Sequence, residues 1–326
     1  MSEVKRHEVS ADEDGMRLDR WFKLHFPQVT FAYLNKLTRT GQVRVGAGRV
    51  KTNSRLVKGQ EIRVPPLAFD TRPADAPKDE VPPLTQKERE LFRSMVLHED
   101  KDLFVLNKPF GFAVQGGTKT HTHLDGLLMG LGAELKERPV LVHRLDRDTS
   151  GVIVVAKRRA VAASLGRLFA TRNVKKTYWA VVKGVPNPAQ GRIDVPLIKA
   201  RSEDGDRMRA SKPEEKDDEQ SAVTSYTVLD KAEDKSASWL SLKPLTGRQH
   251  QLRAHTHHIG TPILGDNKYG GDLDMPGGIA NRLHLHARRI QFPHPREGKV
   301  DITAPLPTHM LETFKAFGFD PERFDD

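Results

Sequence analysis

The stretch HRLDRDTSGVIVVAK, residues 143–157, places a crowded group of charges directly before an apolar run. Residues 152–156 are all valine, isoleucine or alanine. A run of this kind predicts a strand that is buried on both faces. Residues 149–151, Thr-Ser-Gly, predict a turn that leads into this strand. Asp146 is therefore expected at the edge of the core, on a rigid part of the chain.

Two interpretations of Asp146 are open at this point. A carboxylate held at the end of a core strand can face a cleft and take part in chemistry. The alternative is a structural salt bridge within its own group of charges, because buried carboxylates usually have a basic partner whether or not they react. That group is Arg144, Asp146, Arg147 and Asp148. Spacing alone does not decide between the two.

The positive charge of the chain is concentrated near its amino terminus. The 326 residues carry a formal charge of +10. Residues 15–65 hold eleven lysines and arginines against two acids, a net charge of +9, so the rest of the chain is close to neutral. This window favours a polyanionic partner.

The sequence contains no cysteine, which excludes disulfides, zinc–thiolate sites and every mechanism with a thiolate nucleophile. A reducing compartment is the natural location. The first fifteen residues lack the apolar core of a secretory signal, and no apolar run approaches the roughly 20 residues needed to cross a bilayer. We expect a cytoplasmic protein with no membrane association.

Composition and periodicity divide the chain into two domains. Residues 16–26 and 31–38 have helical apolar spacing, and residues 41–65 alternate apolar with basic or polar residues between glycines, which predicts short strands. Residues 1–65 are expected to form this small basic domain. Residues 66–90 are rich in proline and charge and predict a linker, so residues 91–326 form the second domain.

The second domain is predicted to be α+β. Consecutive strand patterns and isolated helices favour a mixed, largely antiparallel sheet with flanking helices over a regular doubly wound fold. The charged stretch at residues 201–221 predicts a mobile surface loop. In KTYWAVVKG, residues 176–184, strand alternation puts Tyr178 and Trp179 on opposite faces, so one can be core while the other lines a cleft.

Three separated segments resemble the core motifs of the large-subunit ribosomal RNA pseudouridine synthases, and they occur in that family's order. They are HRLDRDTSG at 143–151, KTYWAVVKG at 176–184 and TGRQHQLRAH…GTPILGDNKYGG at 246–271. LNKPFGFAVQGG and RLHLHARRIQFPHP, at 106–117 and 282–295, are also similar to family segments. Within the family, the likeness is greatest to the member that modifies three separated uridines. The resemblance implies isomerisation of uridine to pseudouridine in ribosomal RNA or an assembling large subunit, by a monomer.

The resemblance also implies a role for individual residues. Asp146 matches the catalytic aspartate, and Arg253 the basic residue that pairs with it. Tyr178 matches the tyrosine that packs against the target uracil and is a candidate acceptor of the C5 proton, while Arg144 matches the arginine that fills the gap left by a flipped nucleotide. Whether Asp146 attacks C1′ or assists proton loss at C2′ stays open.

The basic amino-terminal domain resembles the αL RNA-binding motif shared with a small-subunit ribosomal protein. The resemblance implies that this domain contacts RNA. Five of its basic residues are the expected contacts, namely Arg17, Arg39, Arg44, Arg49 and Lys51.

No cofactor is expected, because the isomerisation is redox-neutral and conserves atoms, and the sequence has neither a GxxxxGK[ST] nor a GxGxxG motif. Histidines cluster at His121, at residues 255–258 and at His284, but without cysteine or an HExxH pattern we expect ring hydrogen bonds there and no metal. A uracil methyltransferase is excluded by the missing cysteine. A non-catalytic RNA-binding assembly factor is the alternative, and it predicts that Asp146, Tyr178 and Arg253 are dispensable.

Overall fold

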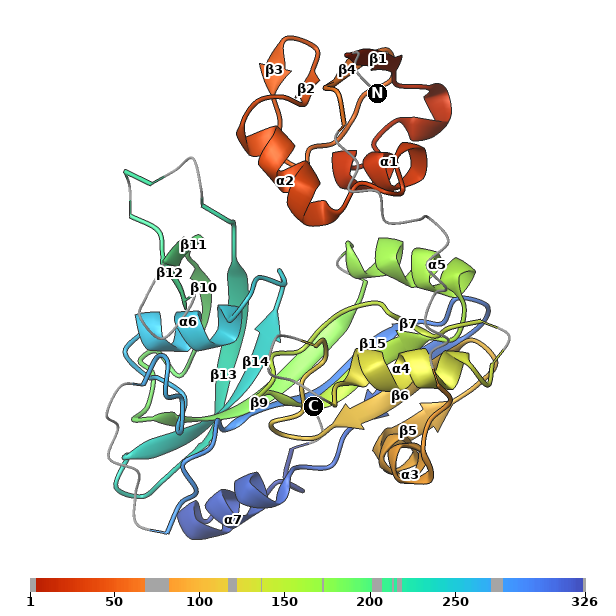
Figure 1. The fold of residues 1–326 in the computed structure, drawn as a ribbon. Helices are drawn as coiled ribbons and strands as arrows, with labels where there is room; N and C mark the ends of the chain where they lie inside the picture. The colour runs from red at the N-terminus through yellow and green to blue at the C-terminus, as the bar shows by residue number, and fades with distance from the viewer. Residues whose placement is uncertain are drawn as a thin grey trace. The chain divides into compact units, whose positions relative to one another are not determined.

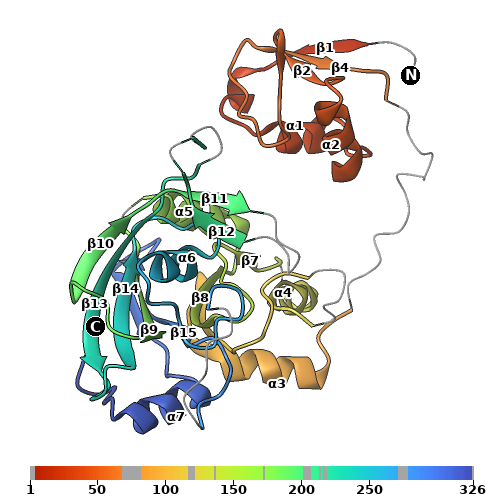
Figure 2. The same cartoon turned by 90° about the vertical axis from the view of Figure 1, so that its left-hand side faces the viewer.

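The computed structural model describes residues 4–67, 82–116, 122–135, 137–171, 173–200, 207–212, 214–215, 219–270 and 278–324. The chain forms two compact units, Met1–Glu80 and Val81–Asp326. Figures 1 and 2 show the elements of each unit from two directions.

The first unit packs two helices against one face of a four-stranded sheet. The helices α1 (Leu18–His25) and α2 (Phe31–Arg39) confirm the two predicted from apolar spacing. The strands lie in the order β1-β4-β2-β3. Their bounds are Lys5–Glu8 for β1, Arg44–Val45 for β2, Gly48–Arg49 for β3 and Glu61–Val64 for β4, with a short 3-10 helix η1 at Ala11–Glu13. Buried Trp21, Phe22 and Leu37 anchor the helices in this core.

The predicted linker extends too far toward the carboxyl terminus. Residues 68–81 lie outside the described part of the chain, but helix α3 already begins at Gln86. Thr85 and Glu88 form a reciprocal capping box at its start, which satisfies free backbone N–H groups of the first turn. Phe92 and Met95 then bury themselves in the core of the second unit. The charge-rich composition before residue 90 led to the prediction of a linker, although the segment begins an amphipathic helix.

The second unit is built on a ten-stranded sheet, which confirms the predicted α+β class. Eight strands follow the order β10-β13-β14-β9-β15-β8-β6-β5, with β16 paired to β15 and β7 to β8. Every pairing of this sheet is antiparallel among the described strands except the parallel contact of β15 with β8. The bounds are Val96–Glu99 (β5), Leu103–Lys108 (β6), Val140–Leu141 (β7), Ser150–Ala156 (β8), Lys175–Lys183 (β9), Gln190–Asp194 (β10), Val223–Lys231 (β13), Ala237–Pro244 (β14), Leu285–Pro293 (β15) and Lys299–Thr303 (β16).

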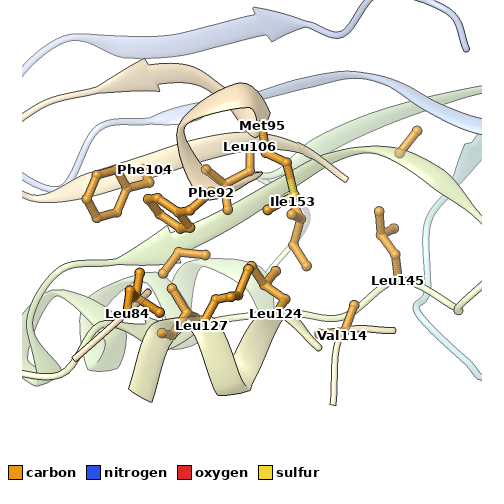
Figure 3. Close-up of a cluster of buried hydrophobic side chains, with 13 residues drawn as sticks. Leu84, Phe92, Met95, Phe104, Leu106, Val114, Leu124, Leu127, Leu145 and Ile153 are labelled. Atoms are coloured by element: carbon orange, nitrogen blue, oxygen red, sulfur yellow. The ribbon is translucent and has the colours of Figure 1, made fainter. Parts of the chain in front are cut away.

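Helices cover both faces of this sheet. Besides α3 (Gln86–Met95), they are α4 (Leu124–Gly132), α5 (Arg159–Phe169), α6 (Gln251–His258) and α7 (Thr308–Phe317). On β8, Val152 and Val154 pack in the cluster beneath α5, whereas Ile153 faces the cluster of α3 and α4 (Figure 3). On β9, Trp179 packs in the α7 cluster and Ala180 in the α6 cluster; α6 and α7 lie on opposite sides of the sheet in Figures 1 and 2. No helix in the described residues is long and apolar enough to cross a membrane.

Two local predictions need correction. The charged stretch 201–221 is not loop throughout, because Arg207–Ala210 forms β12 and pairs with β11 (Leu197–Ala200). Ser150 and Gly151 do not form a turn but begin β8 itself. Gly151 has φ +106°, and a Cβ atom there would lie 2.2 Å from the carbonyl oxygen of Ala287. This glycine is therefore required by the close approach of β15, whose contact with β8 is parallel.

Candidate active site

The loop that carries Asp146 connects β7 to β8 and is fixed from both sides. Leu145 is buried in the apolar cluster with Val114 and Ile153, as Figure 3 shows. The fully buried Lys108 donates from Nζ to the carbonyl oxygen of Arg147 at 2.8 Å, and two further backbone carbonyls accept from the same amine. A carboxylate between these two anchors has little freedom to move, which suits a reacting group.

Asp146 has no basic partner of its own in this loop. Within the described ranges, no ion pair joins Asp146 or Asp148 to either neighbouring arginine, so the salt bridge considered for this stretch is wrong. Arg147 instead donates from Nε to the carbonyl oxygen of Gly111 at 3.1 Å, and the side chain of Arg144 is exposed. The Asp146 side chain is 24% exposed and can reach a substrate.

Tyr178 lies on β9 beside the carboxylate, on the face opposite Trp179 as alternation predicted. Its side chain packs against two apolar clusters, and Tyr178 contributes to the lining of a small cavity together with His143 and Lys176. Burial raises the pKa of Tyr178, and the charge of Asp146 raises it further. Both effects hold the phenol in its protonated form.

Arg253 has a direct partner that the sequence prediction did not include. Its Nε and Nη2 donate to the two carboxylate oxygens of Asp266, at 2.7 and 2.6 Å. Burial lowers the pKa of Arg253, but the hydrogen bonds and charge of Asp266, followed by the charge of Asp146, raise it above its ordinary value. The expected pairing of Arg253 with Asp146 is thus an interaction across the site, and the bidentate ion pair is with Asp266.

The side chain of His250 lies close to the Asp146 carboxylate, and His250 was not among the predicted site residues. Its Nε2 lies 3.9 Å from Oδ2 of Asp146, and its Nδ1 lies 3.1 Å from the hydroxyl of Tyr269. Asp266 and Tyr269 were missed as well. The sequence signal that could have identified them is the Gly-Asp turn in GDNKYGG, which contains both residues. An acid that such a turn directs into the core needs a cationic partner.

The start of helix α6 is locked by Gln251. Its side-chain oxygen accepts hydrogen bonds from Thr246 Oγ1 and the Arg248 N–H, and its amide nitrogen donates to the Val223 carbonyl oxygen and to Thr224 Oγ1. Because every polar group of this buried amide has a partner, the first turn of α6 has a defined position. Arg253 follows two residues later in the same first turn.

The histidine clusters are used mainly for hydrogen bonds inside the fold. His255 contacts Thr224 Oγ1 at 2.9 Å, and His284 contacts Thr313 Oγ1 at 2.7 Å, which confirms the ring hydrogen bonds expected at these two positions. His121 lies outside the described residues. In the described part of the chain, the group that could hold a metal is Asp100, Asp102 and His294. Two arginines, Arg158 and Arg296, already neutralise Asp102, so this group is better explained as an ion-pair network.

The five expected RNA contacts of the first unit are all exposed. Arg17 precedes α1 and pairs with Asp19, Arg39 ends α2, and Lys51 follows β3. Arg44 and Arg49 are cross-strand partners on β2 and β3. The structure brings these two together and leaves the other three on separate segments.

Comparison with known proteins identifies relatives over nearly the whole chain. The family model described as RNA pseudouridylate synthase matches residues 102–258, a range that contains Asp146, Tyr178 and Arg253. The chain is 36% identical over 311 residues to the ribosomal large subunit pseudouridine synthase C of Escherichia coli strain K12, with 93% of each chain covered. It is 34% identical to the protein of the same name from Vibrio cholerae, with 95% of each covered. The solved structure of human RNA pseudouridylate synthase domain containing 4 is similar with a TM-score of 0.58 and 30% identity, covering 71% of this chain and 97% of that chain.

Proposed function

The chain belongs to the RNA pseudouridylate synthase family, and we propose that it isomerises specific uridines of large-subunit ribosomal RNA to pseudouridine. The reaction breaks the bond from N1 of uracil to C1′, turns the base and forms a bond from C5 to C1′. No atom is gained or lost. The substrate class is supported by the relatives whose names specify the large ribosomal subunit.

The observation that carries the proposal is the meeting of Asp146, Tyr178 and Arg253 from three distant segments. The charge of Asp146 raises the pKa of both Tyr178 and Arg253. This effect is additional to those of burial and of the contact between Arg253 and Asp266. A fixed carboxylate beside an aromatic ring offers a group that acts at C1′ or C2′ and a face on which uracil packs. Arg144 is exposed at the same loop and supplies the side chain that occupies the space of the flipped nucleotide.

The register of the first unit supports RNA binding by its open sheet face. Arg6 is opposite Arg63, Arg63 opposite Arg44, and Arg44 opposite Arg49, so one row of arginines crosses all four strands. Directly opposed like charges destabilise a sheet, and among the described residues the acidic contact of the row is the exposed pair of Arg6 with Glu61. Phosphate groups would relieve this repulsion, since guanidinium groups bind phosphate oxygens strongly. We place the reaction in the cytoplasm, on ribosomal RNA or an assembling subunit, with a monomeric enzyme.

The experiment that tests the function is tritium release from ribosomal RNA labelled at C5 of uridine. Asp146→Asn is expected to abolish release and to leave RNA affinity unchanged, because the substitution removes the charge and preserves the shape. Asp148→Asn, in the same loop, is the matched control and should retain activity. Release at the wild-type rate by Asp146→Asn would reject the assignment and would favour a non-catalytic RNA-binding factor.

A further inference from the structure

His250 adopts a backbone conformation that is uncommon for residues other than glycine. It directly precedes α6 with φ 50° and ψ 19°, the left-handed region. Residues other than glycine rarely occupy this region, although Asn, Asp and His do so more often than the rest. Strain of this kind persists where the surrounding structure enforces it, and it clusters at functional sites. The side chain that the strained backbone presents is therefore of interest.

The ring of His250 is enclosed between Asp146 and Tyr269. Its side chain is 10% exposed, with Nε2 facing the Asp146 carboxylate at 3.9 Å and Nδ1 at 3.1 Å from the Tyr269 hydroxyl. Burial lowers the pKa of His250, and the charges of Arg253 and Lys268 lower it further, against the opposing effect of Asp146. The ring is thus kept neutral, so one nitrogen carries hydrogen and the other does not.

The hydrogen bonds of Tyr269 favour one position for that hydrogen. The hydroxyl oxygen accepts the backbone N–H of Met208 at 2.8 Å. Its own O–H has the Nδ1 atom of His250 as acceptor among the described contacts. With Nδ1 accepting, the hydrogen of the neutral ring resides on Nε2 and points toward Asp146.

We propose that His250 is a positioning residue for the reaction: Tyr269 holds its ring in the tautomer with hydrogen on Nε2, and Nε2–H donates a hydrogen bond to the Asp146 carboxylate once uridine is bound. The inference rests on the proposed function of Asp146. The separation of 3.9 Å is longer than a hydrogen bond, and a small rotation of Asp146 closes it, as occurs when catalytic contacts tighten around substrate. Because Arg253 is committed to Asp266, this donor supplies the directional contact that Asp146 lacks in its own loop.

Substitutions at His250 separate this role from a structural one. The amide nitrogen of Gln occupies the position of Nε2, whereas that of Asn occupies the position of Nδ1. We expect His250→Gln to keep kcat within about fivefold of wild type, and His250→Asn and His250→Gly to lower kcat by about 10- to 100-fold with little change in KM, the loss typical of a hydrogen bond to a charged group. Backbone strain predicts the opposite order of stability, because Asn and Gly suit the left-handed region better than Gln.

The measurements are kcat and KM for tritium release by the full-length protein and thermal unfolding of each variant. His258→Gln, at the exposed end of α6, is the control and should behave as wild type. The inference is supported if the His250→Gln variant has a higher kcat than the His250→Asn variant although the His250→Asn variant is at least as stable. It is overturned if Asn or Gly matches wild type in kcat, or if the activities simply follow the thermal midpoints.

A second measurement does not depend on catalysis. Long-range proton–nitrogen NMR of the histidine rings in the free protein distinguishes the two neutral tautomers, and the signal that disappears in His250→Gln assigns the ring. The Nε2–H tautomer is expected in wild type and a mixture in Tyr269→Phe, which also lowers kcat. Finding hydrogen on Nδ1 in wild type overturns the inference. If wild-type protein releases no tritium, the proposed function fails, while the tautomer result stands separately.

Discussion

Arg253 binds Asp266 through two hydrogen bonds inside the core of the second unit, where the two side chains are 7% and 0% exposed. Asp266 also accepts the backbone N–H groups of Lys268 and Tyr269. One carboxylate thus organises both the guanidinium and the turn that carries the tyrosine next to His250. Removing it should affect stability and catalysis together.

Asp266→Asn is expected to destabilise the protein by about 3 to 5 kcal/mol, because it leaves the charge of Arg253 buried without its counterion. The exposed pair of Arg192 with Asp194 provides the control, and Asp194→Asn should cost less than about 1 kcal/mol. Urea unfolding measures both. Equal effects of the two substitutions would show that the buried pair is not important for stability.

Arg253→Lys is expected to lower kcat strongly, because an ammonium group cannot reproduce the planar two-point contact with Asp266. Stability should fall by less than in Asp266→Asn, since a positive charge is retained opposite the carboxylate. Tritium release and urea unfolding of the same protein preparation test this. Near-normal turnover would mean that Arg253 has a structural role alone.

Gly151→Ala is expected to be severely destabilising. A Cβ atom at this position would lie 2.2 Å from the carbonyl oxygen of Ala287, in a strand pair that cannot separate without disturbing the sheet. Gly166, within α5, has nothing within 4 Å of a Cβ atom, and Gly166→Ala should stabilise the helix by about 0.5 to 1 kcal/mol. Thermal unfolding of the two variants should therefore shift in opposite directions. Similar shifts would contradict the close-approach explanation.

The elements with strong periodicity could be predicted from the sequence, whereas contacts set by register and close approach could not. The apolar run of β8 and the amphipathic spacing of α1 and α2 were sufficient to define those elements. Nothing in the spacing showed that Gly151 accommodates β15 and does not form a turn, because that requirement comes from Ala287, far along the chain. The row of arginines on the first sheet likewise exists only through strand register.

The candidate site divides in the same way. The expected roles of Asp146 and Tyr178 came from the resemblance of their motifs to those of the family. The partner of Arg253 depends on the turn at Gly265, which has φ +69° and approaches the carbonyl oxygen of Arg282 so closely that a Cβ atom would lie 1.9 Å from it. This turn directs Asp266 into the core. His250 was not predicted, because its ring is placed beside Asp146 by a left-handed backbone conformation that the sequence does not reveal.

Two histidines of the core make stability depend on pH. Burial lowers the pKa of His284 to about 4 and that of His286 to about 3. Both folded values lie below the unfolded value of about 6.5, so the unfolded chain binds protons first as the pH falls. Stability is therefore complete above about pH 6.5 and is lost below it, by about 1.4 kcal/mol per pH unit for each histidine.

Urea unfolding at a series of pH values between 7.5 and 5 tests this dependence. His286→Asn is expected to reduce the slope of unfolding free energy against pH by about 1.4 kcal/mol per unit below pH 6.5, because one proton-binding group is removed from the unfolded chain. His258→Gln, which replaces a histidine at the exposed end of α6, is the control substitution. An unaltered slope in His286→Asn would show that this ring binds its proton equally in both states.

The arginine row is predicted to contact RNA phosphates, and paired substitutions can distinguish it from general positive charge. Arg44→Gln with Arg49→Gln removes two members of the row, which should reduce the slope of log affinity against log salt concentration by about 1.5. Lys23→Gln with Lys58→Gln removes the same charge from exposed positions outside the row and should change the slope less. Because replacing Arg44 and Arg49 removes like-charge repulsion across β2 and β3, the thermal midpoint of this double variant should not fall. RNA affinity measured at several salt concentrations tests whether the row contacts phosphates. Equal slopes for the two double variants would mean that the row acts only through net charge.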